Sequence, residues 1–147
     1  MKNREKKISI LIADDDPDDR ILLKEAFDEN FSLKEIHFVE NGEELMEFLL
    51  KKGKFDGDKA GLPSLILLDL NMPKKDGREA LKEIKNHQVL KRIPVIVFST
   101  SKSEDDLIKA YNLGVNSFIT KPVTYVELLE VTKTIGKYWF DTAILSH

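Results

Sequence analysis

The chain has 147 residues, with 23 Lys and Arg against 26 Asp and Glu, and no Cys. This length fits one ordinary domain, the near balance of charge gives no nucleic-acid footprint, and the lack of Cys excludes disulfides, cysteine nucleophiles and thiolate metal sites. The charged amino terminus leads into an apolar run that Asp14 ends, which is neither a signal peptide nor a membrane span, so we expect a cytoplasmic protein that binds neither DNA nor membranes.

Short apolar runs alternate with segments of helical periodicity along the whole chain. Strands are predicted, in chain order, at residues 8–13, 35–39, 65–68, 95–98 and 117–119. Helices are predicted at residues 17–29, 43–51, 78–86, 104–112 and 125–138. This alternation predicts an α/β fold, in which a parallel sheet of central strands is covered by helices on both faces.

The helices carry apolar stripes and end signals. Two of the stripes are Ile21, Leu22 and Phe27 in the first helix and Leu107, Ile108 and Tyr111 in the fourth. Pro17 fits a first helical turn, Ser103 is predicted as the N-cap of the fourth helix, and Gly114 as its stop. Residues 53–61 hold three of the seven glycines and are predicted to form a flexible surface loop.

Acidic residues follow the first and third predicted strands. Asp14 and Asp15 follow the first, and Asp69 follows the third. Residues beyond the carboxyl ends of parallel strands converge, and clustered carboxylates without Cys or His suit a hard cation such as Mg²⁺. Taken alone, the run from Asp14 to Asp19 is better explained as helix capping. Asp69 has no capping duty in view, so its position at the end of an apolar strand favours a functional role.

Polar residues also follow the fourth and fifth strands. Ser99 begins a Ser-Thr-Ser segment that is either turn chemistry or a source of a hydroxyl beside the site. Lys121 is either a solvated surface lysine or a mobile charge that reaches an anion. Together, acids, a hydroxyl and an ammonium at one edge of the sheet predict a site for a doubly charged phosphoryl group and its metal.

Four motifs carry a resemblance to a known family. They are Ile12-Ala13-Asp14-Asp15-Asp16-Pro17, Leu67-Leu68-Asp69-Leu70-Asn71-Met72-Pro73-Lys74-Lys75-Asp76-Gly77, Pro94-Val95-Ile96-Val97-Phe98-Ser99 and Phe118-Ile119-Thr120-Lys121-Pro122. In this order and spacing they resemble the receiver domain of two-component response regulators. The resemblance implies one receiver domain over 1–147, with a core at about 7–138 and an aromatic extension at 139–147. It also implies a flavodoxin-like, doubly wound sheet of five parallel strands in the order 2-1-3-4-5, with five helices.

The resemblance assigns a role to each acid. Asp69 matches the phosphoacceptor. Asp15 matches a direct ligand of Mg²⁺ (or Mn²⁺), and Asp14 a ligand that acts largely through water. The Asp69 carboxylate and the backbone carbonyl of Asn71 complete the implied metal site.

The resemblance also implies a switch. Ser99 and Lys121 match the residues that bind the phosphoryl oxygens and assist the transfer, and Thr100 matches the small residue that follows. Phe118 matches the switch aromatic, which is a tyrosine in the archetype, and a phenyl ring at this position has no hydroxyl to donate to a partner. Phosphorylation is expected to draw Ser99 toward the site while Phe118 rotates inward.

The implied partners are proteins. A sensor histidine kinase or a phosphotransfer protein would supply the phosphoryl group, and a downstream effector protein would read the switch. The segment at 71–81, the long loop before the third strand and the aromatic tail are most similar to short stand-alone regulators that partner bacteriophytochromes. The tail is expected either to pack back on the domain or to form a homodimer contact.

Two other functions fit parts of the pattern. A haloacid dehalogenase-type phosphatase also uses an aspartyl nucleophile after a strand, but its signature requires a second acid where this chain has Asn71. A receiver-like interaction module that is never phosphorylated is the other alternative. The presence of Asp14, Asp15, Asp69, Ser99 and Lys121 argues against it, so a signalling switch rather than an enzyme with its own substrate is expected.

Overall fold

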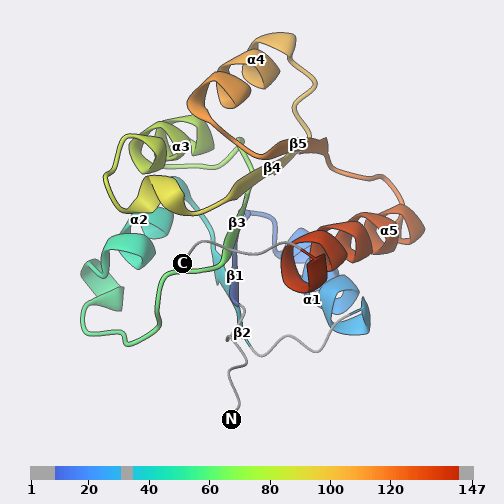
Figure 1. The fold of residues 1–147 in the computed structure, drawn as a ribbon, viewed down its shortest axis with the longest axis horizontal. Helices are drawn as coiled ribbons and strands as arrows, with labels where there is room; N and C mark the ends of the chain where they lie inside the picture. Colours follow the sequence, from blue (N-terminus) through green and yellow to red (C-terminus); the bar gives the residue numbers. More distant parts are fainter. Residues whose placement is uncertain (1–8, 31–34, 143–147) are drawn as a thin grey trace.

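The computed structural model of the chain describes residues 9–30 and 35–142, with side chains as far as Trp139 (Figure 1). The strands are β1 (Ser9–Ala13), β2 (Glu35–Val39), β3 (Leu65–Leu68), β4 (Val95–Ser99) and β5 (Ser117–Thr120). The α-helices are α1 (Pro17–Asn30), α2 (Gly42–Leu50), α3 (Gly77–Lys85), α4 (Glu104–Leu113) and α5 (Tyr125–Gly136). Shorter helical segments are η1 (Gly53–Phe55), η2 (Leu90–Arg92) and η3 (Lys137–Thr142). Every predicted strand and helix is present, with ends that agree to within two residues, and Ile8, the predicted start of the first strand, lies outside the described residues.

The strands form one parallel sheet in the order β2-β1-β3-β4-β5, which confirms the predicted topology. Helices α1 and α5 lie together on one face, and α2, α3 and α4 cover the other (Figure 1). The order places β2 and β5 at the edges of the sheet. The prediction that all strands are central is therefore wrong for these two, and their side chains are mostly half-buried rather than buried.

The core consists of two apolar layers, one on each face of the sheet. Alternate residues of a strand enter different layers because side chains along a strand point to opposite faces. In β3, Leu65 and Leu67 pack in the layer beneath α1 and α5, whereas Ile66 and Leu68 pack in the layer beneath α2 and α3. Apolar residues on both faces explain why the strand reads as a continuous apolar run.

The apolar stripes predicted for α1 and α4 differ from the faces that are buried in the structure. The prediction is wrong in part for α1 and entirely for α4. In α1 the buried residues are Leu23, Ala26 and Phe27, whereas Ile21 is 57% exposed. Residues three and four apart share a helix face, and the packed face of α1 is set by α5 rather than by the longest apolar side chains. The predicted stripe residues that lie exposed are Ile21 and Leu22 in α1 and Leu107, Ile108 and Tyr111 in α4. Helix α4 makes its main contacts with α3 and the edge strand β5, and of its residues only Ala110 is buried.

The predicted ends of α4 are confirmed. The hydroxyl of Ser103 accepts a hydrogen bond from the backbone N–H of Asp106 at 3.2 Å, which satisfies a free donor of the first turn. Gly114 ends the helix with a φ of 100°, a left-handed conformation that favours glycine. The predicted loop at 53–61 contains the short helix η1, and its Phe55 ring packs edge-on against Phe48 at 5.1 Å.

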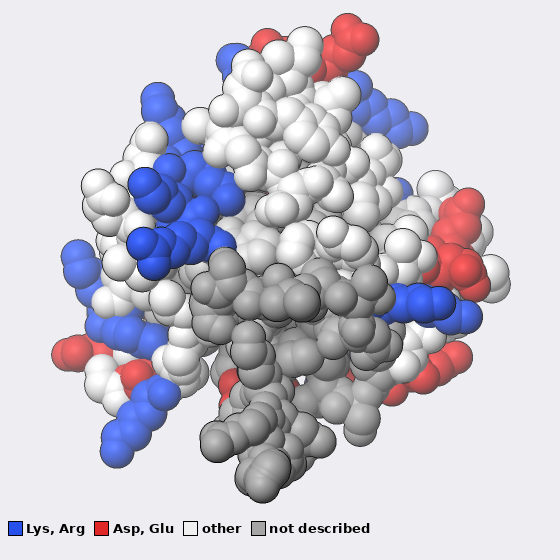
Figure 2. All heavy atoms as spheres, in the orientation of Figure 1, with Lys and Arg blue, Asp and Glu red and all other residues white. Residues whose placement is uncertain are grey.

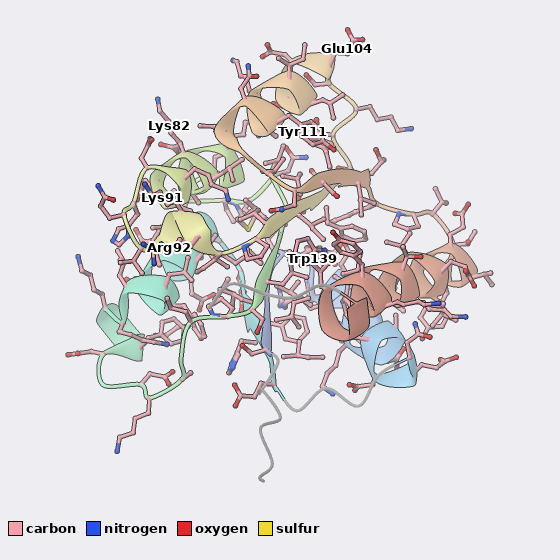
Figure 3. All side chains as sticks on the ribbon, in the orientation of Figure 1. Lys82, Lys91, Arg92, Glu104, Tyr111 and Trp139 are labelled. Carbon is pink, nitrogen blue, oxygen red and sulfur yellow. The ribbon has the colours of Figure 1, made fainter. Side chains whose placement is uncertain are left out.

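The aromatic extension begins as η3, a π-helical turn that continues α5. Trp139 is half-buried and packs against the core layer beneath α1 and α5 (Figure 3). Tyr138 is exposed and meets the Trp139 ring edge-on at 5.0 Å. The start of the extension thus packs back on the domain, and residues 143–147 lie outside the described part of the chain.

Positive side chains gather on the surface over α3 and η2 (Figure 2). Lys82, Lys91 and Arg92 belong to this group (Figure 3), and within the described residues none of them forms an ion pair. The group lies beside the amino end of β4, whereas the acids of interest follow the carboxyl ends of the strands. In the described part of the chain, no helix combines the length and the apolar character needed to cross a bilayer.

Candidate functional site

Backbone hydrogen bonds place the key acids side by side at the carboxyl edge of the sheet. The N–H of Asp69 donates to the carbonyl of Ala13 at 3.0 Å, and the N–H of Asp14 donates to the carbonyl of Val39 at 3.0 Å. Both bonds extend the ladders of neighbouring strands by one residue. The carboxylates of Asp14 and Asp69 therefore meet at the point where β1 and β3 end, and both residues are buried.

Lys121 joins these acids from the end of β5. Its Nζ lies 2.9 Å from Asp14 Oδ2, 2.8 Å from Asp19 Oδ2 and 2.8 Å from Asp69 Oδ2. The N–H of Lys121 donates to the carbonyl of Ser99 at 2.9 Å, so β4 fixes the start of the lysine loop. The structure thus places Lys121 beside the acids, with a side chain that is only 10% exposed rather than solvated.

The site holds more negative charge than its lysine neutralises. Burial raises the pKa of Asp14 to about 6, although hydrogen bonds from Lys121 and from the N–H of Asp16 oppose the rise. Burial by itself lowers the pKa of Lys121, but its bonds to Asp19, Asp69 and Asp14 outweigh this and raise it well above the usual range. The ammonium therefore stays charged, while a buried carboxylate beside it remains costly to ionise.

Asp14, Asp15 and Asp69 form a cluster suited to a divalent cation. Each offers a carboxylate oxygen, and these oxygens lie within 4.8 Å of one another. Asp15 is exposed, whereas Asp14 and Asp69 are buried, so the cluster opens to solvent on one side. An oxygen-only donor set and an unneutralised carboxylate fit a hard ion. The predicted acids are thus brought together, and Asn71 lies in the loop that follows Asp69.

Both oxygens of Asp69 are held in place. Ser99 is buried, and its hydroxyl donates to Asp69 Oδ1 at 2.9 Å. The N–H of Asn71 donates to the same oxygen at 3.0 Å, and Lys121 binds Oδ2. Hydrogen bonds on both oxygens restrict the carboxylate to one orientation, as a nucleophile or metal ligand requires.

Gly77 lets α3 start directly against the end of β3. A Cβ at this position would lie 2.2 Å from the carbonyl oxygen of Asp69 and 2.7 Å from the Cα of Leu70. Such contacts are too short for any side chain, so only glycine permits this approach. The N–H of Gly77 also donates to the carbonyl of Leu70 at 3.0 Å. The glycine therefore positions the loop that carries Asp69 and Asn71.

Phe118 lies half-buried against the core layer beneath α2 and α3. Its N–H donates to the hydroxyl of Tyr111 at 3.1 Å, which joins β5 to α4. Tyr111 lies between α4 and β5 in Figure 3. Tyr111, which the sequence predicted to lie on the apolar stripe of the fourth helix, is therefore a hydrogen-bonded neighbour of Phe118.

Three residues that bond to the predicted site directly or through one other side chain were not predicted from the sequence. Asp19 pairs with Lys121, but it falls in an acidic run that, taken alone, is better explained as helix capping. Arg78 binds Asp106 through two hydrogen bonds of 2.8 and 2.7 Å and reaches Asn71 Oδ1 at 3.3 Å. Hydrogen bonds from Arg78 and then Ser101 lower the pKa of Asp106 to about 2. No local signal marks Arg78 and Asp106, because they are far apart in sequence.

Comparisons with known proteins agree with this geometry. The sequence profile of the response regulator receiver domain matches residues 10–133. The response regulator Rcp1 of Synechocystis is 40% identical over 139 residues, which cover 95% of this chain and 92% of Rcp1.

Two solved structures are also similar. The phosphorylated cyanobacterial phytochrome response regulator RcpA superposes with a TM-score of 0.90 at 42% identity, covering 97% of this chain and 100% of RcpA. The Mn²⁺-bound form of Rcp1 superposes with a TM-score of 0.87 at 38% identity, covering 95% of this chain and 99% of that one. Both matches extend over nearly the full length of each protein.

Proposed function

Because the chain belongs to the response regulator receiver domain family, a family of phosphorylation-controlled switches, we propose that Asp69 is its phosphoacceptor. The observation that carries the proposal is the placement of Asp69 between a buried hydroxyl and a buried ammonium. These are the groups that a phosphoryl oxygen needs once the acceptor is modified. Family membership argues against the phosphatase alternative, and we take the receiver to be one domain over residues 1–147.

The proposed reaction is an in-line phosphoryl transfer from a histidine. A carboxylate oxygen of Asp69 attacks the phosphorus, the new O–P bond forms, and the P–N bond breaks with its electron pair left on the imidazole nitrogen. Lys121 moves from the Asp69 carboxylate to a phosphoryl oxygen, where it stabilises negative charge. Ser99 is 2.9 Å from the attacking carboxylate, so a small movement suffices for its hydroxyl to bond another phosphoryl oxygen.

The proposed cofactor is Mg²⁺, with Mn²⁺ as a substitute. Asp14, Asp15 and Asp69, with the backbone carbonyl of Asn71, are the residues that would hold it. Such an ion supplies positive charge to the phosphoryl oxygens in the transition state. The geometry supports the proposal, because Asp14, Asp15 and Asp69 bring three carboxylates together, and Lys121 is the cation paired with Asp14 and Asp69 among the described residues.

The phosphoryl donor is proposed to be a histidine kinase or phosphotransfer protein that docks over the site. Leu22 and Val123 are exposed, Val123 to 95%, and both line a pocket of about 130 Å³ together with Lys121 and Tyr125. Exposed apolar side chains next to a charged site suit a helical partner that buries them while it delivers its histidine. The similar protein RcpA is a phytochrome response regulator, so we propose a phytochrome-type kinase, which would place this chain in the cytoplasm.

The output is proposed to run through β4 and β5. When Ser99 moves toward the phosphoryl group, the space that it leaves admits Phe118, which is half-buried at present. This rotation changes the surface beside Tyr111 on α4, whose exposed Leu107 and Ile108 would meet an effector or a second copy of the chain.

The test is phosphorylation with a small donor. The protein is incubated with acetyl phosphate and Mg²⁺, and its intact mass is followed, with Asp69→Asn as the paired variant. We expect the mass of one phosphoryl group, dependent on Mg²⁺, labile in base and absent from the variant. If the mass of the wild-type protein stays unchanged under conditions in which a known receiver is phosphorylated, the proposal is overturned.

A further inference from the structure

Arg78 and Asp106 join the first turns of α3 and α4. The guanidinium Nε lies 2.8 Å from Asp106 Oδ1, and Nη2 lies 2.7 Å from Asp106 Oδ2, so the pair is bidentate. Arg78 also binds both oxygens of the α3 N-cap, Asp76, at 3.1 and 3.0 Å. A planar guanidinium held at both ends fixes the distance between two helices more firmly than a single lysine contact does.

This ion pair is part of a closed hydrogen-bonded ring that includes the proposed phosphoacceptor. The ring consists of Asp69, Asn71, Arg78, Asp106, Ser101 and Ser99. Ser101 donates to Asp106 Oδ2 at 2.7 Å, and its N–H approaches Ser99 Oγ at 3.4 Å. The ring thus ties the loop after β3 to the loop after β4, on the side of Asp69 away from Lys121.

We propose that the Arg78–Asp106 pair is a latch that holds the loop between β4 and α4 in its resting position and so opposes the switch at Asp69. This inference rests on the proposed function of Asp69. Arg78 does not touch the reacting atoms. It acts through Asn71 on one side and through Asp106 and Ser101 on the other, which makes it a positioning residue.

Phosphorylation of Asp69 is expected to strain the bonds of the latch. A phosphoryl group on Asp69 requires Ser99 to give up its bond to Asp69 Oδ1 and to turn toward a new oxygen. Ser101 follows Ser99 by two residues, so this movement strains its bond to Asp106. Arg78 holds both oxygens of Asp106 through charged bonds of 2.8 and 2.7 Å, whereas Ser101 holds only one, so Asp106 resists being carried along. Loss of the Arg78–Asp106 pair should therefore lower the free energy needed for the conformational change at Asp69.

The test measures binding of fluoroberyllate, a phosphoryl mimic, in the presence of Mg²⁺. Apparent dissociation constants are obtained by NMR titration for the wild type, Arg78→Gln, Asp106→Asn and the double variant. Asp105→Asn is the matched control, because Asp105 lies on the same helical turn but pairs with Lys109 outside the ring. Amide exchange of residues 100–106 in the unbound proteins reports directly on the release of the loop.

We expect both single variants to bind the mimic about 3- to 10-fold more tightly, with faster amide exchange, and the double variant to match them. A through-space effect of charge would instead shift the two single variants in opposite directions, since one loses a positive and the other a negative charge. Opposite shifts, no shift relative to Asp105→Asn, or weaker binding in both would each overturn the latch.

Two controls separate the possible failures. If Asp106→Asn does not fold, Ser101→Ala removes the next bond of the ring without changing any charge and should show the same tighter binding. If the wild type itself binds no fluoroberyllate with Mg²⁺, the proposed function fails. If the wild type binds and the variants bind equally well, the latch alone fails.

Discussion

The ammonium of Lys121 lies 2.8 Å from Asp69 Oδ2 and 2.9 Å from Asp14 Oδ2, so one cation after β5 neutralises acids that follow β3 and β1. The Coulomb energy of such a pair is large because these side chains are shielded from water. Removal of Lys121 leaves the buried carboxylates of Asp14 and Asp69 without this counter-charge, which is the costly case. Removal of one carboxylate instead leaves Lys121 paired with the others.

Lys121→Ala should lower the free energy of unfolding by about 3 kcal/mol at pH 7.5 without metal. Added Mg²⁺ should recover part of this loss, because it offers the acids another cation. Urea unfolding with and without Mg²⁺ checks both effects. Lys109→Ala is the control, since Lys109 pairs with Asp105 on an exposed surface and should change stability by only a few tenths of a kcal/mol. Equal losses in the two variants would contradict the buried role of Lys121.

Asp14→Asn should stabilise the metal-free protein at pH 7.5 by about 1 kcal/mol. Burial raises the pKa of Asp14 from 3.8 to about 6, so the folded state binds a proton more tightly than the unfolded state does. The stabilising contribution of this proton is complete below pH 3.8 and is lost as the pH rises through 6. Asn mimics the protonated form, so its advantage should vanish near pH 4.

The measurement is thermal or urea unfolding of both proteins across pH 4–8. Mg²⁺ should stabilise the wild type more than Asp14→Asn, because the variant lacks a carboxylate ligand. An advantage of Asn that is the same at pH 4 and pH 7.5 would show that ionisation of Asp14 is not its cause.

Ser99→Ala should retain phosphorylation of Asp69 by acetyl phosphate but lose the conformational response. The hydroxyl is buried and donates to Asp69 Oδ1, so its removal should also cost about 1 kcal/mol of stability. Intact mass reports the phosphoryl group, and NMR signals of β5 and α4 report the response. Ser99→Thr keeps the donor and should keep the response, provided that its methyl group is accommodated. A full response in Ser99→Ala would remove this hydroxyl from the switch.

Gly77→Ala should destabilise the protein by about 2 kcal/mol or more. The added methyl group would lie 2.2 Å from the carbonyl oxygen of Asp69, so α3 has to move away from the site. Gly61→Ala is the control, because a Cβ there meets nothing within 4 Å. Urea unfolding compares stability, and the phosphorylation rate of the folded fraction tests whether the loop that carries Asp69 is displaced.

Most strands and helices could be predicted from the sequence alone. Apolar runs of the right length, with Pro17, Ser103 and Gly114 as end signals, mark nearly every boundary, because caps and strand composition are local properties. Which face of a helix is buried was less readable. Ile108 is as apolar as any core residue, yet it is 56% exposed, since α4 packs mainly against α3 and the edge strand β5 through its other face.

By itself the sequence determined an α/β fold and the residues that meet at its carboxyl edge. Parallel strands all end at that edge, so Asp14, Asp69, Ser99 and Lys121 had to lie near one another. Only the tertiary structure decided how they pair, that Asp19 shares the lysine, and that Arg78 ties the site to α4 through Asp106. The physical reason is the sequence separation of the residues involved. The ends of strands are determined by local sequence pattern, whereas an ion pair between residues far apart in the sequence depends on helix positions that only the packed core sets.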